Sequence, residues 1–239
     1  MAESLPSKAK VPVATGPEHR IPELCKLFYQ LGWMTGSGGA LSIRQGDAVY
    51  ITPSGLQKES LTPRDLFVLD WATQSIVRAP SPPAKPSACT PLFFHCHSLP
   101  NANVCIHTHS QNAVLATLVY TGDVFEITGQ EMIKGIRNAV TGRNHSNTDK
   151  LVVPIIENAP EEDQLGEAIA QAIQRYPAAC AVLVRRHGVF VWGPTWEKTK
   201  VMAECYDYLF EIAFKMIQAG LDPRATYQPH PTANSSSTG

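Results

Sequence analysis

Three histidines have the types and spacing of a metal site. His107 and His109 occur in CIHTHS after an apolar run, and His187 follows a second apolar run in VRRHGV. On a strand, residues i and i+2 point to the same side, so His107 and His109 would direct both imidazoles to one point. Together with His187, which precedes Gly188, they could bind zinc and leave a fourth position for water or substrate. From the residues alone, a chance HxH pair and an unrelated His187 stay an open alternative.

A second histidine pair, His95 and His97, lies in CTPLFFHCHSL. We expect this segment, residues 89–99, to form a helix. Residues i and i+2 of a helix lie about 200° apart around its axis, so these imidazoles cannot converge on one ion. We therefore do not expect this pair to bind the metal.

Composition excludes several classes of protein. The 239 residues carry a formal charge of −1 with no basic stripe, which argues against nucleic acid or an anionic membrane as a partner. A bilayer span needs about 20 apolar residues, and neither such a run nor the apolar core of a signal peptide is present in the sequence. The six cysteines form no CxxC pair, and we expect buried thiols in a cytoplasmic protein.

The order of the segments predicts one domain between two tails. We expect residues 1–19 and 223–239 to be disordered and residues 20–222 to form a single catalytic domain. Helical spacing marks 21–34, 161–177 and 194–220, whereas short β-rich runs with turn signals fill much of the remainder. This order predicts an α/β fold of three layers, α/β/α, with a central, mainly antiparallel sheet.

Seven segments, taken together, resemble the class II aldolase/adducin superfamily. In chain order they are TGSGGALSIR, YITPSGLQKE, CTPLF, CIHTHS, QEMIKG, LVVPIIEN and VRRHGVFVWG, and they span about residues 20–220. The resemblance implies the class II aldolase-like fold and one catalytic Zn²⁺ per subunit, held by His107, His109 and His187. It also implies a homotetramer with active sites at subunit boundaries. Three imidazoles would accept other first-row metals as well.

One departure from the aldolases bears on the reaction. Sugar-phosphate aldolases of this superfamily carry a glutamate where this chain has Cys89 in CTPLF. The chain is more similar to the dehydratases of the superfamily, whose QEMIKG segment presents Glu131 as the catalytic carboxylate. By itself, Glu131 could equally be an acidic residue of a helix's first turn. We expect Cys89 to contribute to the substrate pocket.

The phosphate of a sugar-phosphate substrate needs its own site. The segments TGSGG and TPSG are turns whose backbone N–H groups could bind an anion. The resemblance assigns Ser54, Gly55 and Ser87 to the phosphate loops of the superfamily, whereas the residues alone are equally compatible with ordinary hairpin turns. Lys58 and Lys134 are candidate counter-charges.

Three functions follow from the resemblance. The first is a zinc-dependent lyase that removes water from a small 2-keto sugar phosphate. The second is an aldolase or epimerase of the same fold. The third is a binding protein without catalysis, as adducin is, or one that acts in apoptosis, as animal relatives of the dehydratases are thought to do. An intact histidine triad with Glu131 favours the first.

Overall fold

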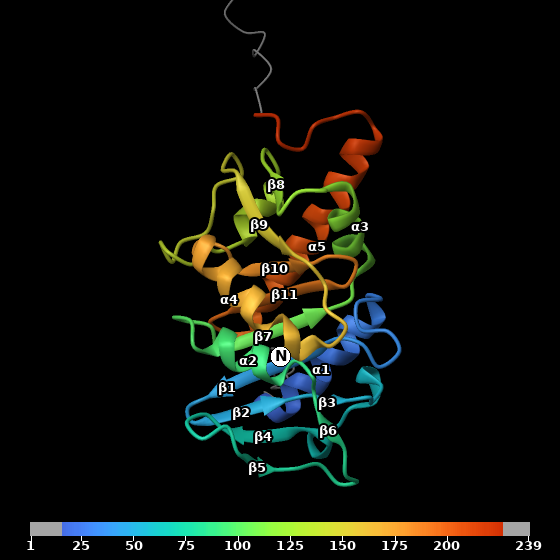
Figure 1. The fold of residues 1–239 in the computed structure, drawn as a ribbon, viewed down its shortest axis with the longest axis vertical. Coiled ribbons are helices and arrows are strands. Elements are labelled where there is room, and N and C mark those ends of the chain that lie inside the picture. The colour runs from blue at the N-terminus through green and yellow to red at the C-terminus, as the bar shows by residue number, and fades with distance from the viewer. Residues whose placement is uncertain (1–15, 227–239) are drawn as a thin grey trace, which may run out of the picture.

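The computed structural model describes residues 16–226, and its centre is a sheet of nine strands (Figure 1). Their order across the sheet is β5-β4-β2-β1-β7-β11-β10-β9-β8. The strands are β1 Ala40–Gln45, β2 Ala48–Ile51, β4 Phe67–Asp70, β5 Ile76–Arg78, β7 Val104–Thr108, β8 Val124–Ile127, β9 Leu151–Ile156, β10 Ala181–Val184 and β11 Gly188–Gly193. A separate pair joins β3 Pro53–Ser54 to β6 Lys85–Pro86.

Antiparallel pairing dominates the sheet. Of its adjacent pairs, β9 and β10 alone run parallel. Two hairpins lie within the sheet: β1 pairs with β2 around the Gly46 turn, and β10 pairs with β11 around His187. The expectation of a mainly antiparallel central sheet is confirmed.

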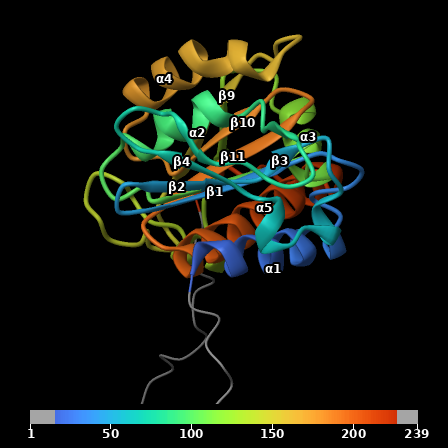
Figure 2. The same cartoon turned by 90° about the horizontal axis from the view of Figure 1, so that it is seen from below.

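Helices cover both faces of the sheet (Figure 2). One face carries α1 Pro17–Gln30, α3 Gln111–Val119 and α5 Trp196–Gln218, and the other carries α2 Thr90–His97 and α4 Gly166–Arg175. Each face has its own hydrophobic core: Phe28 and Phe210 belong to the first, and Phe93 and Ile169 to the second. The three predicted layers are therefore observed.

Short 3₁₀ turns complete the described chain: η1 Lys58–Ser60, η2 Pro63–Asp65, η3 Glu131–Gly135 and η4 Glu162–Leu165. The segment QEMIKGI thus contains a 3₁₀ turn. Its Ile133 is buried, and Gly135 lies against α5, where an added Cβ would be 2.2 Å from the Cys205 Sγ. Only glycine allows this approach, so the close packing on α5 fixes where η3 and Glu131 lie.

The tail boundaries require small corrections. Helix α1 begins at Pro17, because proline is favoured in a first turn, so residues 17–19 are helical rather than part of a tail. At the other end, Pro223 is buried and its carbonyl accepts the Thr128 backbone N–H at 3.0 Å. The other expected tail residues, 1–15 and 227–239, lie outside the described residues.

Two expectations from composition can be compared with the structure. All six cysteines lie within the described residues as buried thiols rather than disulfides, as expected. Within residues 16–226, every helix is too short or too polar to cross a bilayer.

Candidate active site

The first two histidines lie where β7 meets α3. His107 is on β7, fully buried, with its ring stacked on Phe190 of the neighbouring strand β11 at a centroid distance of 4.0 Å. His109 follows the strand directly. Helix α3 begins two residues later, at Gln111, because Ser110 is a good N-cap and its side chain accepts the N–H groups of Asn112 and Ala113. The change from strand to helix therefore ends the HxH motif at the edge of the sheet.

His187 lies in the tight turn between β10 and β11. Arg186 in this turn has a left-handed backbone with φ 57°, and its N–H donates to Thr117 Oγ1 at 3.0 Å. A Cβ on Gly188 would lie 2.0 Å from the Thr108 carbonyl oxygen. The glycine after His187 therefore lets β11 approach the HxH segment closely, which brings the third imidazole to the first two.

The three imidazoles converge through the same ring atom. The Nε2 of His109 lies 3.0 Å from the Nε2 of His107 and 3.0 Å from that of His187. Among the described residues, these three form the group of potential ligands, with ligand atoms within 4.8 Å of one another, that could hold a metal ion. The structure thus brings together the three histidines that the sequence singled out.

Acceptors on the far side of two rings fix their tautomers. His107 Nδ1 lies 3.2 Å from the Val189 carbonyl oxygen, which can only accept, so Nδ1 carries the hydrogen. His187 Nδ1 lies 3.1 Å from the Oδ1 of Asn158. That oxygen also accepts the Ala159 backbone N–H at 3.0 Å, which fixes the orientation of the amide. Both rings therefore direct an Nε2 lone pair toward the convergence point, as metal-bound histidines do.

This donor set fits zinc. Zinc–nitrogen bonds of about 2.0–2.1 Å in a tetrahedral site place two nitrogens about 3.3 Å apart, close to the 3.0 Å separations observed. Three imidazole ligands also leave one position for water or substrate, as in catalytic sites. Other divalent first-row metals would accept the same ligands.

The Gly-rich segment TGSGG lies against the triad. A Cβ on Gly38 would be 2.6 Å from His109 Nδ1, and a Cβ on Gly39 would be 3.0 Å from the His107 carbonyl oxygen. Both glycines are therefore needed for the loop to contact the histidines. Lys58 is buried behind this loop, and its Nζ donates to the carbonyls of Ser37 at 2.8 Å and Leu56 at 3.0 Å. A buried lysine, rather than an exposed counter-charge, thus joins the TGSGG and TPSG segments.

The candidate phosphate residues are connected to this loop. Ser54 lies on β3, which pairs with β6, the strand that ends one residue before Ser87. Gly55 has φ 72°, a conformation that glycine adopts at low cost. Ser87 is buried and its Oγ accepts the backbone N–H of Cys89 at 3.2 Å. Cys89 is the buried N-cap residue of α2, which packs on β7.

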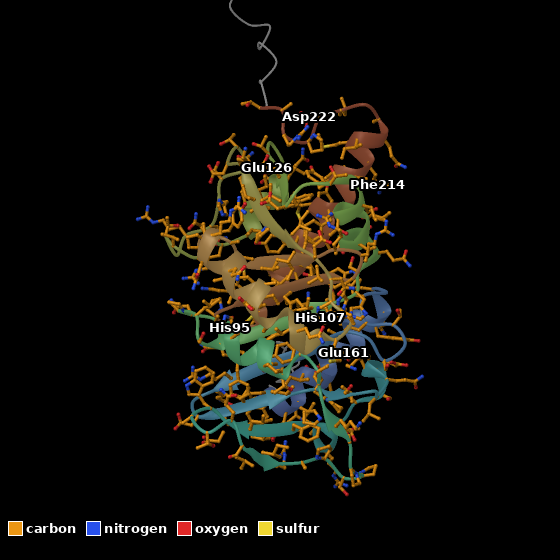
Figure 3. All side chains as sticks on the ribbon, in the orientation of Figure 1. His95, His107, Glu126, Glu161, Phe214 and Asp222 are labelled. Carbon is orange, nitrogen blue, oxygen red and sulfur yellow. The ribbon has the colours of Figure 1, made fainter. Side chains whose placement is uncertain are left out.

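Glu131 lies apart from the triad. Its side chain is 70% exposed and pairs with Lys134 at 2.8 Å, and Asn147 donates to it at 3.4 Å. The strand that leads into η3, β8, is separated from β7 by β11, β10 and β9. Figure 3 shows the same separation, with Glu126 of β8 at one end of the molecule and His107 at its middle. Within one subunit, Glu131 therefore stands outside the cluster of convergent ligands.

The second histidine pair behaves as the helical geometry predicts. His95 is exposed on α2, whereas His97 is buried, with Nδ1 donating to the Ala102 carbonyl at 2.7 Å and Nε2 accepting from Ser42 Oγ at 2.8 Å. Burial lowers the pKa of His97 to about 4, so the residue is neutral near pH 7. It is a satisfied core histidine.

The fold, the histidine triad and the sequence agree on one class of protein. The chain belongs to the class II aldolase and adducin N-terminal domain family, whose pattern matches residues 19–214. Among curated proteins, it is 59% identical over 213 residues to methylthioribulose-1-phosphate dehydratase of Osmerus mordax, covering 87% of each chain. It is 56% identical over 208 residues to the enzyme of that name from Bos taurus, covering 87% of this chain and 86% of the other.

Solved structures support the fold independently. An L-fuculose 1-phosphate aldolase superimposes with a TM-score of 0.69 at 16% identity, covering 89% of this chain and 94% of the other. An aldolase II superfamily protein from Pseudomonas syringae superimposes with a TM-score of 0.65 at 15% identity, covering 91% and 82%. At these identities the likeness establishes the fold.

Proposed function

We propose that the chain is a zinc-dependent hydro-lyase of methionine salvage. It converts 5-methylthioribulose 1-phosphate to 2,3-diketo-5-methylthiopentyl 1-phosphate. The observation that carries this proposal is the convergence of three histidine Nε2 atoms in a chain 59% identical to a methylthioribulose-1-phosphate dehydratase. An enzyme is favoured over an adducin-like scaffold because a scaffold needs no such convergence.

His107, His109 and His187 would hold the metal. A zinc ion held there would supply Lewis-acid catalysis, which would make the C3 hydrogen of the substrate more acidic. The chain contributes the rigid positions of the three rings, because two of them are oriented by the Val189 carbonyl and by Asn158.

Glu131 would transfer the proton. It takes the hydrogen from C3, and the electron pair of the C3–H bond becomes the C2=C3 double bond of an enediolate. That pair then moves to C3=C4 as the C4 hydroxyl departs, protonated by Glu131, as water. The resulting enol tautomerises to the 2,3-diketone. Positioned acid–base groups of this kind contribute roughly 10²–10⁴-fold to a rate.

Glu131 would act on a substrate bound at the histidine triad of a neighbouring subunit. Its carboxylate is 70% exposed and stands outside the histidine cluster of its own chain, so a second copy offers the simplest route to a complete site. A closed homotetramer with sites at its subunit boundaries fits this requirement. Light scattering on the purified protein would test it, since a monomeric mass would contradict the tetramer.

The phosphate would bind along the connected loops. Ser54 and Ser87 offer hydroxyl donors, Gly55 offers backbone near the same pair of short strands, and Cys89 would line the pocket at the start of α2. These segments reach the triad through the Lys58 contacts and Gly38. A substrate held at the metal by one end and at the phosphate loops by the other would present a fixed carbon to Glu131.

An aldolase or epimerase is the second candidate function, favoured by the superposition on L-fuculose 1-phosphate aldolase. Cys89 argues against it, because the resemblance places the aldolases' glutamate at this position. A thiol at a buried helix start lacks the acid–base properties of that carboxylate.

NMR of substrate turnover separates these reactions. The zinc-loaded protein is mixed with 5-methylthioribulose 1-phosphate and the products are identified. Dehydration gives the diketone, an aldolase gives two shorter carbonyl compounds, and an epimerase gives a stereoisomer of unchanged mass. A protein that binds zinc but leaves this substrate unchanged would contradict the dehydratase, and aldolase substrates and then protein partners would be tested next.

We also propose a cytoplasmic location. The support is the set of six buried thiols, which suits a reducing compartment. Fractionation of cells that express the tagged chain would test it, and recovery in a secreted or organellar fraction would contradict it.

A further inference from the structure

A partly buried carboxylate is hydrogen-bonded to the segment that follows His109. Asp207, on α5, accepts hydrogen bonds from the hydroxyl of Ser110 and from Asn112 Nδ2 at 2.9 Å. Both donors belong to the start of α3, so the carboxylate fixes this segment relative to α5.

One of these contacts lies next to His109. Ser110, which donates to Asp207, follows His109 in the chain, and the His109 backbone N–H donates to the Trp33 carbonyl at 2.8 Å. The backbone of His109 is therefore held on one side by the covalent link to Ser110 and on the other by the hydrogen bond to Trp33.

The hydroxyl of Ser110 both accepts hydrogen bonds from the start of α3 and donates one to Asp207. It accepts the backbone N–H groups of Asn112 at 3.1 Å and Ala113 at 3.4 Å, which caps α3. A hydroxyl has a single hydrogen, and donating it to Asp207 leaves both lone pairs available for the cap. The carboxylate thus sets the orientation of the cap residue that adjoins His109.

The imidazole of His109 is confined from another direction. Gly38 lies so close to Nδ1 that an added Cβ would be 2.6 Å away. Its backbone is held at Ser110 and at Trp33, and its side chain lies against Gly38. His109 therefore has little freedom to move its Nε2. This matters because His109 Nε2 is the atom that contacts both other imidazoles.

We propose that Asp207 is a positioning residue of the metal site, which acts through Ser110 to hold His109 in its ligating position. The proposal rests on the proposed metal site. It goes beyond the ligand set, because Asp207 itself has no contact with the convergence point.

Zinc affinity measured by competition with a chromogenic chelator tests this role. The full-length wild type and Asp207→Asn are compared; the amide keeps the size of the side chain but replaces one acceptor oxygen with a donor. Substitutions around metal ligands typically weaken metal binding by about 10–100-fold, and we expect a loss in this range. The cobalt-loaded variant should also show an altered visible absorption spectrum, which a purely structural role would leave unchanged.

Two matched variants separate positioning from general support of the fold. Asn112→Ala removes a donor to the same carboxylate but is not adjacent to His109, so zinc affinity should stay within about twofold of wild type, below the usual effect of disturbing a ligand's support. Glu211→Gln removes an exposed carboxylate one turn further along α5 and should have no effect. Ser110→Ala should weaken binding as Asp207→Asn does, and the double variant should be no worse than either. Ser110→Ala carries the test if Asp207→Asn does not fold.

The outcomes are distinct. A folded Asp207→Asn with wild-type zinc affinity and an unchanged cobalt spectrum would overturn the proposal while the metal site stands. Equal losses in Asn112→Ala and Ser110→Ala would also overturn it, because they would make Asp207 a general structural residue. A wild type that binds no zinc would overturn the metal site itself.

Discussion

Asn158 holds His187 in the tautomer that metal binding requires: its Oδ1 lies 3.1 Å from the imidazole Nδ1 and is itself oriented by the Ala159 N–H. Asn158 follows β9, and His187 follows β10, the parallel neighbour of β9. Because β9 and β10 are the one parallel pair in the sheet, the residues that follow them, Asn158 and His187, lie at the same ends of the two strands.

Asn158→Ala should weaken zinc binding by about tenfold, because the His187 ring loses the acceptor that fixes its orientation. Chelator competition measures this. Asn103→Ala is a matched control, since Asn103 is an exposed asparagine at the other end of β7 whose amide reaches the Pro194 carbonyl. Equal affinities for Asn158→Ala and wild type would show that Val189 and the metal suffice to orient the triad.

Gly38→Ala should disrupt the triad from the opposite side. The new Cβ would meet His109 Nδ1 at 2.6 Å, so either the loop or the imidazole must shift. We expect metal binding and turnover to fall by at least about tenfold, as when a ligand's support is removed. Gly122→Ala introduces the same methyl group where no atom lies within 4 Å and should behave as wild type. An active, zinc-binding Gly38→Ala would be incompatible with the loop geometry described here.

Lys58→Met should destabilise the fold and weaken substrate binding. It removes the donor to the Ser37 and Leu56 carbonyls in a buried position, and each unsatisfied buried group costs about 1–3 kcal/mol. Urea unfolding should show a loss of about 2–6 kcal/mol on that basis, with a raised KM if the two loops bind phosphate. Lys198→Met, an exposed lysine on α5, provides the comparison. Unchanged stability and KM would refute the role of Lys58 in joining the loops.

His97 should make stability depend on pH between about 6.5 and 4. Its pKa is lowered by burial from 6.5 to about 4 in the folded protein, so over this range the unfolded chain takes up a proton that the folded chain does not. The free energy of unfolding should therefore fall as the pH drops through this window, by about 3 kcal/mol, and this loss should be absent above it.

Denaturant unfolding at several pH values isolates that contribution. His97→Gln should flatten the dependence between about pH 6.5 and 4, because the titrating group is gone. His95→Gln, on the exposed side of the same helix, should leave it as in wild type. Identical slopes in wild type and His97→Gln would mean that His97 titrates normally in the folded protein.

The parts of the site that the sequence could predict are those that depend on the spacing of residues close together in the chain. His107 and His109 alternate at the end of a strand, and the glycine after His187 marks a close backbone approach, so the three candidate ligands were accessible to reasoning from residues. The hairpins around Gly46 and His187 and the amphipathic α1 follow from the same short-range rules.

The residues that sequence reasoning missed act across long separations. Asn158 meets His187 29 positions away, and Asp207 meets Ser110 97 positions away. Such contacts depend on which strands become neighbours, and spacing along the chain carries no direct information on that. A polar residue just beyond an apolar strand, as Asn158 is two residues after the end of β9, was the available signal. Lys58 was expected to be a counter-charge at most, because burial of a lysine is rare.

The central claim is that three histidines of one subunit and Glu131 of another form a dehydration site. The most direct test is complementation: Glu131→Gln and His109→Ala are each prepared as zinc-treated proteins, then mixed, dissociated and reassembled, and dehydration of 5-methylthioribulose 1-phosphate is followed by NMR. We expect each variant alone to lose at least about 10²-fold in activity, and the mixture to regain a substantial fraction, because some sites receive an intact triad and an intact Glu131. A mixture as inactive as its components despite reassembly, or a fully active Glu131→Gln, would contradict the account.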